Sequence, residues 1–241
     1  MPDSRMLASV GLAIALPFSG RPISPEFALC LSAQNFPLNM RRNLFAIKGK
    51  PVDEARNELA LNAIKAQCKY TWFLDDDVAP PFHAVRSLIN QLENTDEKTM
   101  VCGGIYCYKY SPTEPVVFRG EGLGAFWKWK QGDVFEVTSI GTGCMLIKTE
   151  VFDKIPKPWF KTVDTAEFQQ NDDLYWCQKV REAGFKILAD GNVLTTHLDW
   201  DSDAQDFVPY ELPDDCYPLR PVSEAEPRCE RSLNGSLDRR T

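Results

Sequence analysis

The sequence predicts an α/β fold in which helices flank a central, mainly parallel sheet. Over the first half of the chain, apolar runs of strand length alternate with segments of helical periodicity. This β-α-β-α-β order is typical of parallel sheets with right-handed crossovers. The run 70–74 is apolar and ends at a turn, as a buried central strand does. With 241 residues, of which 44% are hydrophobic, the chain can bury one full core.

The N-terminal segment 7–16 is apolar and follows Arg5, so it fits either the first buried strand or the hydrophobic part of a signal peptide. It is too short to span a bilayer, and no small-residue cleavage site follows it, so we favour the strand. The prolines at 22–25 then open a helix that continues to Ala33, and residues 44–47 form a short second strand.

The middle of the chain continues the alternation. Apolar residues at helical spacing predict a helix over 52–68, and a second helix begins at Pro81. Residues 100–106 return as a strand, which we expect Gly103 and Gly104 to interrupt. From 110 to 137 the pattern dissolves into Pro, Gly and aromatic residues, which predicts loops or short antiparallel strands over one end of the sheet.

The C-terminal part repeats the pattern once more. Residues 144–147 form an apolar strand, and Leu174, Cys177 and Val180 define the buried face of a helix ended by Gly184. Two strand-like runs follow, at 185–190 and 193–197. We expect one domain over residues 1–200. An acidic, Pro-rich tail over 201–241 follows it, lid-like or poorly ordered.

The most informative polar feature is Asp75-Asp76-Asp77, at the end of the predicted central strand. Ligands of open α/β sheets bind outside the carboxyl ends of such strands. In an extended chain Asp75 and Asp77 project to one side and Asp76 to the other. Adjacent carboxylates repel each other, so a cluster that stays ionised needs a compensating cation, and hard oxygen ligands suit Mg²⁺ or Mn²⁺. The alternative is an ordinary acidic turn at the end of a strand.

A second polar cluster, Asn171-Asp172-Asp173, stands directly before a predicted helix. An Asn followed by acidic residues is also what helix capping and the helix dipole favour without any catalysis. The run that follows this helix ends in His197, one of only two histidines in the chain. Polar clusters thus recur after strand or turn elements, which favours a function for them.

Composition excludes some classes of protein. The chain has 27 basic and 34 acidic residues and a net charge of −7. A nucleic-acid-binding surface would need a basic face, so this charge balance argues against nucleic acid as a partner. The eight cysteines include no C-x-x-C pair, and Cys30, Cys68, Cys144 and Cys177 lie in apolar or periodic segments where they pack as small hydrophobes. We expect a reducing, cytoplasmic environment, no structural zinc and no membrane span.

In order along the chain, these motifs resemble the GT-A-fold glycosyltransferases of the family-2-like group, over roughly residues 7–198. The motifs that carry the resemblance are Leu16-Pro17, Val52-Asp53-Glu54-Ala55-Arg56-Asn57, Phe73-Leu74-Asp75-Asp76-Asp77, Gly141-Thr142-Gly143 with the apolar strand behind it, Asn171-Asp172-Asp173, Ala183-Gly184-Phe185 and the run 193–197. D-x-D alone occurs by chance in many chains, but the ordered set is much more specific. The resemblance implies a GT-A, Rossmann-like nucleotide-diphospho-sugar transferase fold and a hexosyltransferase-like activity.

The resemblance also implies roles for individual residues at the donor site. Asp75, Asp77 and His197 would hold Mn²⁺ or Mg²⁺, with Asp77 bridging the cation to the diphosphate of a sugar nucleotide. Asp75 would also lie toward the ribose or sugar. Pro17, Arg56 and Asp76 would contact the nucleotide, for which a UDP-sugar is favoured.

On the acceptor side, the resemblance implies that Asp173 is the base of an inverting reaction. It would take a proton from a hydroxyl of a glycan or other acceptor. The family's acidic pair is Glu-Asp, preceded by glycine, whereas this chain has Asp-Asp after Asn171, so Asp172 is a second candidate for the base. The Q-x-x-R-W signature of processive synthases is missing, which favours transfer of a single sugar.

Two other functions remain open at this stage. A metal-dependent nucleotidyl or phosphoryl transferase would also use the Asp triplet, although the chain has no G-x-x-x-x-G-K-[ST] loop. A carbohydrate- or nucleotide-binding relic would keep the fold without turnover. Trp127, Trp129 and Trp159 suit the stacking of an acceptor sugar, but aromatic residues supply much of any core, so at least one of them is expected to be buried.

Overall fold

The computed structural model describes residues 11–120, 124–165 and 169–212. Within these ranges the main sheet contains seven strands. They are β1 (Gly11–Phe18), β2 (Arg41–Lys48), β3 (Tyr70–Leu74), β5 (Thr99–Ile105), β7 (Val134–Val137), β9 (Cys144–Lys148) and β12 (Lys186–Leu194). Their order is β2-β1-β3-β9-β5-β12-β7. Only β9 and β7 run against the other five strands, so the sheet is mixed but mainly parallel, as the sequence predicts.

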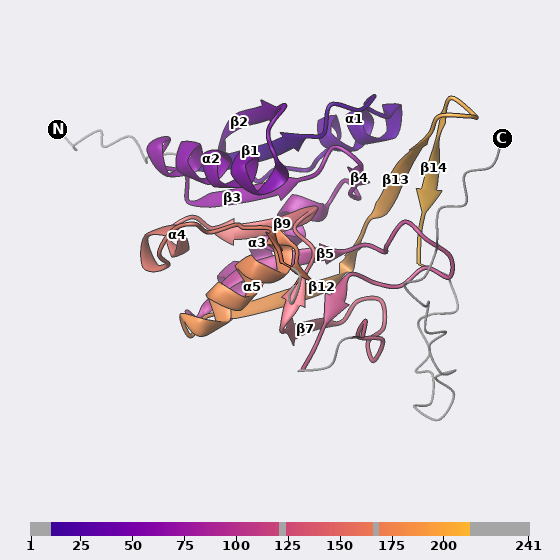
Figure 1. The fold of residues 1–241 in the computed structure, drawn as a ribbon. Helices are drawn as coiled ribbons and strands as arrows, with labels where there is room; N and C mark the ends of the chain where they lie inside the picture. The colour runs from indigo at the N-terminus through magenta and orange to yellow at the C-terminus, as the bar shows by residue number, and fades with distance from the viewer. Residues whose placement is uncertain (1–10, 121–123, 166–168, 213–241) are drawn as a thin grey trace.

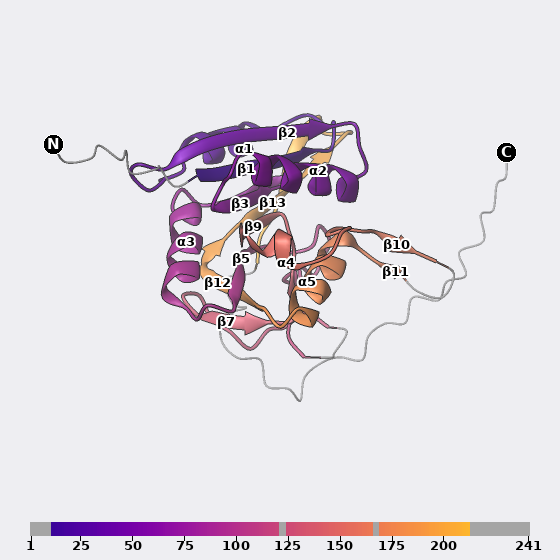
Figure 2. The same cartoon turned by 90° about the vertical axis from the view of Figure 1, so that its left-hand side faces the viewer.

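Helices cover both faces of this sheet (Figures 1 and 2). They are α1 (Pro25–Ser32), α2 (Val52–Lys65), α3 (Ala84–Asn94), α4 (Val151–Lys154) and α5 (Asp172–Glu182). Side chains of α2, α4 and α5 pack in one core layer, and side chains of α1 and α3 pack in the other. Figure 2 shows α3 and α5 on opposite sides of the sheet.

Strand β3 shows why both layers are needed. Phe73 points into the layer of α2 and α5, whereas Trp72 and Leu74 point into the layer of α1 and α3. All five side chains of β3 are buried. A strand that buries both faces must be apolar throughout, which explains why the run 70–74 lacks the alternation of a half-exposed strand.

The two glycines predicted to interrupt the fourth strand do not do so, and β5 continues through them. A Cβ atom added to Gly103 would meet the Ile140 side chain at 2.8 Å, and one added to Gly104 would meet Val193 at 2.6 Å. These glycines therefore serve close packing across the strand. The two C-terminal strand-like runs were also predicted wrongly, because residues 186–194 form the single strand β12 and His197 lies near the start of the next strand.

A smaller sheet extends the carboxyl edge of the main one. It joins β4 (Val78–Ala79), β13 (Thr196–Asp201) and β14 (Asp206–Tyr210) in the order β14-β13-β4. The remaining short strands pair antiparallel, β6 (Val117–Phe118) with β8 (Ser139–Ile140) and β10 (Val163–Asp164) with β11 (Gln169–Gln170). The predicted boundary at residue 200 thus falls within β13, and the division into a domain and a tail stays a prediction.

Several other predictions can be compared with the described residues. Among the tryptophans proposed for acceptor stacking, Trp129 and Trp159 are buried in the core. Cys68, Cys144 and Cys177 are buried free thiols, and Cys30 is a half-buried one. No helix in the described part of the chain is long and apolar enough to cross a bilayer. Residues 7–10 of the predicted first strand and residues 213–241 of the predicted tail lie outside the described ranges.

Candidate active site

The polar motifs gather at the carboxyl edge of the sheet, where a small groove of about 170 Å³ opens. The end of β1, the start of α2 and the Asp triplet line it. Pro17 and all three aspartates contribute to the lining, as does Lys50 from the turn before α2. The crossover order of a parallel sheet brings these segments together, because it leaves strand ends and helix starts at one edge.

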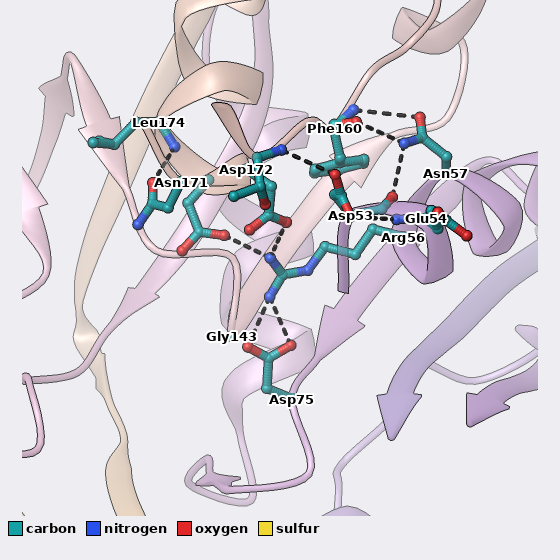
Figure 3. Close-up of polar contacts among 12 residues, drawn as sticks. Asp53, Glu54, Arg56, Asn57, Asp75, Gly143, Phe160, Asn171, Asp172 and Leu174 are labelled. Carbon is teal, nitrogen blue, oxygen red and sulfur yellow. Dashed lines mark hydrogen bonds and ion pairs between the residues drawn. The ribbon is translucent and has the colours of Figure 1, made fainter. Parts of the chain in front are cut away.

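Arg56 lies at the centre of the site, and Figure 3 shows its guanidinium between Asp75 and Asp172. Its side chain is only 3% exposed. Nη2 donates to both oxygens of Asp75 at 2.9 and 2.8 Å. Nη1 donates to Asp172 and, at 2.7 Å, to Asp173. One arginine therefore joins the first carboxylate cluster to the second.

The electrostatics of this cluster follow from burial and mutual repulsion. Burial lowers the pKa of Arg56, but the three carboxylates outweigh it and raise that pKa well above its ordinary value, so the guanidinium stays charged. Burial raises the pKa of Asp75 to about 6; Asp77 and Asp173 add to this rise, while Arg56 opposes it. Burial likewise raises the pKa of Asp172 against the lowering effect of Arg56.

Helix α2 holds Arg56 in position through its neighbour Asn57. The Asn57 amide donates to the Phe160 carbonyl at 2.7 Å, as Figure 3 shows. Its oxygen accepts from the backbone N–H of Trp159 at 2.9 Å. Asp53, one turn earlier, accepts from the N–H of Thr162 at 3.0 Å. The polar residues around Arg56 in its motif thus tie the helix to the segment that leads toward α5.

The second cluster has both a structural and an electrostatic role. Asn171 is the N-cap of α5, and its side chain accepts from the N–H of Leu174 at 3.0 Å. The capping interpretation is therefore confirmed, yet the two aspartates of the first turn also pair with Arg56. Their side chains differ in exposure, 6% for Asp172 and 15% for Asp173, so Asp173 is the more accessible carboxylate.

Asp77 lies on the other side of the triplet beside His197. The backbone explains this, because β13 pairs with β4 with His197 opposite Val78, and the N–H of Leu198 donates to the Asp77 carbonyl at 2.7 Å. His197 Nε2 lies 3.7 Å from Asp77 Oδ1. Its Nδ1 lies 2.8 Å from the carbonyl oxygen of Cys107, which can only accept, so Nδ1 carries a proton and Nε2 faces Asp77.

Lys109 is the third member of this group. Its Nζ lies 2.6 Å from Asp77 Oδ2 and 3.4 Å from Asp199 Oδ1, and Asp199 in turn pairs with Arg21 at 3.2 Å. Burial would raise the pKa of Asp77, but His197 and Lys109 outweigh it and lower that pKa to about 2. Asp77 is therefore an ionised carboxylate at neutral pH.

Asp76 bonds to the turn after β1, whereas Asp75 and Asp77 pair with cationic side chains. Its Oδ2 accepts from both the backbone N–H and the hydroxyl of Ser19, each at 2.9 Å. These bonds fix the turn after β1, next to Pro17 in the groove. Asp76 thus shapes the groove wall, and its predicted contact with a nucleotide stays a prediction.

The motif Gly141-Thr142-Gly143 forms hydrogen bonds that hold the backbone of the Asp triplet. The N–H of Asp75 donates to the Gly143 carbonyl at 3.0 Å, and the N–H of Gly143 donates to the hydroxyl of Tyr106, which lies 3.2 Å away. A Cβ atom on Gly141 would lie 2.0 Å from that hydroxyl. Glycine is therefore required here by close approach of the Tyr106 ring.

A divalent cation fits part of this site. The carboxylate of Asp77 and the Nε2 atom of His197 face one another, and the bond from Nδ1 to a backbone carbonyl is the usual support of a metal-binding histidine. Asp75, the third predicted ligand, turns its carboxylate to Arg56. In the described part of the chain, no group of three or more His, Cys, Asp or Glu side chains is arranged to hold a metal. A cation here would need ligands from a bound molecule or water.

The structure thus brings the predicted site residues together at the carboxyl edge of the sheet, and it adds residues that the sequence did not indicate. Arg56 is enclosed by carboxylates, so the predicted contact with a nucleotide would require it to leave some of them. Sequence reasoning missed Lys109, Lys50 and Ser19. It also gave no role to Asp199. Lys109 and Ser19 lie in irregular segments and Lys50 in a turn, so periodicity gave no signal for them.

Comparison with solved structures agrees with the predicted fold class. "A197 from STIV" is 18% identical and aligns with a TM-score of 0.56 over 84% of this chain and 94% of that one. "GalNAc-T7 with UDP, GalNAc and Mn2+" is 10% identical, with a TM-score of 0.52 over 80% of this chain but only 44% of that chain. The fold is the GT-A fold of glycosyltransferases. No protein-family model and no curated protein matches the sequence, so membership of family 2 stays a prediction.

Proposed function

We propose that this protein is a metal-dependent glycosyltransferase. It would move a single sugar, with inversion, from a nucleotide-diphosphate sugar to a hydroxyl acceptor. One observation carries the proposal: Asp75, Asp77, His197, Asp172 and Asp173 converge on one edge of a GT-A sheet, where Asp75 and Asp77 line a groove. The GalNAc-T7 structure, which shares this fold, holds UDP and Mn²⁺, which supports a nucleotide and a divalent cation as ligands here.

The donor would lie in the groove between β1 and α2. Pro17, Lys50, Asp75 and Asp76 line this groove, and the two aspartates would lie toward the nucleoside of the donor. Asp77 and His197 would hold Mn²⁺ or Mg²⁺, with the diphosphate oxygens supplying further ligands. When bound, that cation supplies positive charge for the departing diphosphate.

Asp173 is our proposed base. It is the more exposed of the two aspartates at the start of α5 and needs only to accept a proton from an acceptor hydroxyl. Asp172 is more buried and serves chiefly to hold the guanidinium of Arg56. Arg56 Nη1 lies 2.7 Å from Asp173 Oδ1 and holds the carboxylate in place, so a well-positioned acceptor hydroxyl would complete the arrangement.

The proposal is tested by a panel of UDP-, GDP- and dTDP-sugars incubated with the protein, Mn²⁺ and a set of hydroxyl acceptors such as simple glycosides, with release of free nucleotide as the readout. We expect one donor to be consumed, and the anomeric configuration of the product to be inverted by NMR. A nucleoside triphosphate turned over in place of every sugar donor would assign the site to nucleotidyl transfer instead.

A further inference from the structure

Lys109 lies where a divalent cation would have to approach Asp77. Its ammonium is 2.6 Å from Asp77 Oδ2, while His197 stands beside the other carboxylate oxygen, Oδ1. Its side chain is only 17% exposed, so the ion pair with Asp77 is largely shielded from solvent. A cation on Asp77 and His197 would sit within a few ångströms of this ammonium, and like charges at that separation repel strongly.

The backbone around Lys109 is fixed, so only its side chain can respond. Cys107 forms a bridge with Pro115, and the N–H of Tyr108 donates to the Glu114 carbonyl at 2.9 Å. The Cys107 carbonyl also accepts from His197. The same short segment therefore supports the proposed metal ligand and carries Lys109. A lysine side chain, with four methylene groups, can swing its charge without moving that segment.

Asp199 gives Lys109 a second anchor. Its Oδ1 lies 3.4 Å from Lys109 and 3.2 Å from Arg21, which comes from the turn that Asp76 orders through Ser19. An ammonium that leaves Asp77 thus stays tethered beside the proposed diphosphate position. A phosphate is the natural new partner for it, because lysine binds phosphate as a point charge.

We propose that Lys109 is a diphosphate-binding residue of the donor site, held on Asp77 when the site is empty and drawn to the donor diphosphate when a nucleotide binds, which frees Asp77 for a divalent cation. This inference rests on the proposed function. It predicts that Lys109 lowers the affinity for metal and raises the affinity for nucleotide. In the free protein Lys109 competes with the metal, so metal binds weakly alone. With a nucleotide present, Lys109 adds to its affinity, even without metal.

The test is calorimetric titration of the full chain and of Lys109→Met with three probes: Mn²⁺ alone, nucleotide diphosphate in EDTA, and nucleotide diphosphate with Mn²⁺. The nucleotide is UDP, GDP or dTDP, whichever the wild-type protein binds. In Lys109→Met we expect Mn²⁺ alone to bind about tenfold tighter and the nucleotide in EDTA about tenfold weaker, each the size of one charge-assisted contact. Lys109→Arg should restore the nucleotide affinity.

A matched control is Lys186→Met. Lys186 also pairs with an aspartate at 2.6 Å, Asp96, but at the start of β12, away from the groove. It should leave all three affinities unchanged. If Lys109→Met weakens nucleotide binding without strengthening Mn²⁺ binding, or changes neither, the inference is wrong while the proposed function stands. If the wild-type protein binds none of UDP, GDP and dTDP with Mn²⁺, the proposed function fails and the inference with it.

Discussion

The two cations at the carboxyl edge of the sheet, Arg56 and Lys109, face opposite ends of the same Asp triplet. Arg56 is enclosed by three carboxylates, and its side chain is 3% exposed. Lys109 pairs with two carboxylates, is 17% exposed and reaches the site from an irregular segment. The difference fits the roles that we propose, in which Arg56 is a permanent counter-charge and Lys109 an exchangeable one.

Arg56→Met should show the largest effect on stability. It leaves Asp75, Asp172 and Asp173 close together without a cation, and removal of one partner from a buried ion pair costs about 3–5 kcal/mol. Urea unfolding would measure the loss. Lys109→Met should lower the free energy of unfolding by less than about 1 kcal/mol, as for a more exposed pair. Equal losses in the two variants would contradict the division between them.

Asp173→Asn should have the largest effect on catalysis. Loss of a general base lowers kcat by about 10²–10⁴-fold, and the donor should bind as before. The matched variant is Asp172→Asn, which removes a more buried partner of Arg56 and should reduce stability more than the Asp173 change does. Rate assays and thermal unfolding of both variants separate the roles. A kcat loss confined to Asp172→Asn would reassign the base.

Asp77→Ala should remove metal-dependent nucleotide binding by more than about a hundredfold, because it deletes a direct ligand, and changes in outer ligands alone cost about 10–100-fold. The fold should survive, since the change also relieves repulsion within the triplet. Circular dichroism would check the fold and calorimetry the affinity. An unchanged affinity in the presence of Mn²⁺ would exclude Asp77 as a metal ligand.

Asp76→Ala should have the smallest effect of this series. Its carboxylate holds the turn at Ser19, so its loss should loosen the groove wall and weaken nucleotide binding by about tenfold or less, one charge-assisted hydrogen bond. Ser19→Ala removes one of the two bonds and should produce part of the same effect. A loss as large as that of Asp77→Ala would place Asp76 among the direct ligands.

The Asp triplet could be located from sequence because the signal was local. A wholly apolar run of strand length ends in it, and a strand buried on both faces has no other pattern. The same holds for Arg56, which lies within the predicted helix over 52–68, and for the capped start of α5. In each case the residues that define the element are adjacent to the residues of the site.

The arrangement of Lys109 and Asp199 could not be predicted in this way. Lys109 follows the end of β5 in a segment without periodicity, and only tertiary pairing brings it to Asp77. Asp199 stands just before the predicted tail and had no predicted role, but pairing of β13 with β4 and β14 makes it part of a sheet. The Gly103-Gly104 error has the same origin, because contacts with Ile140 and Val193 are not visible in the local sequence.

The most direct test of the account is calorimetric titration of the purified protein with UDP-, GDP-, CMP- and dTDP-sugars, first with Mn²⁺ and then with EDTA. The account predicts that one nucleotide-diphosphate sugar binds in Mn²⁺ and that its affinity falls at least about tenfold in EDTA, because a cation held by Asp77 and His197 would supply positive charge for the diphosphate. Absence of binding to every donor, or an affinity indifferent to EDTA, would contradict it.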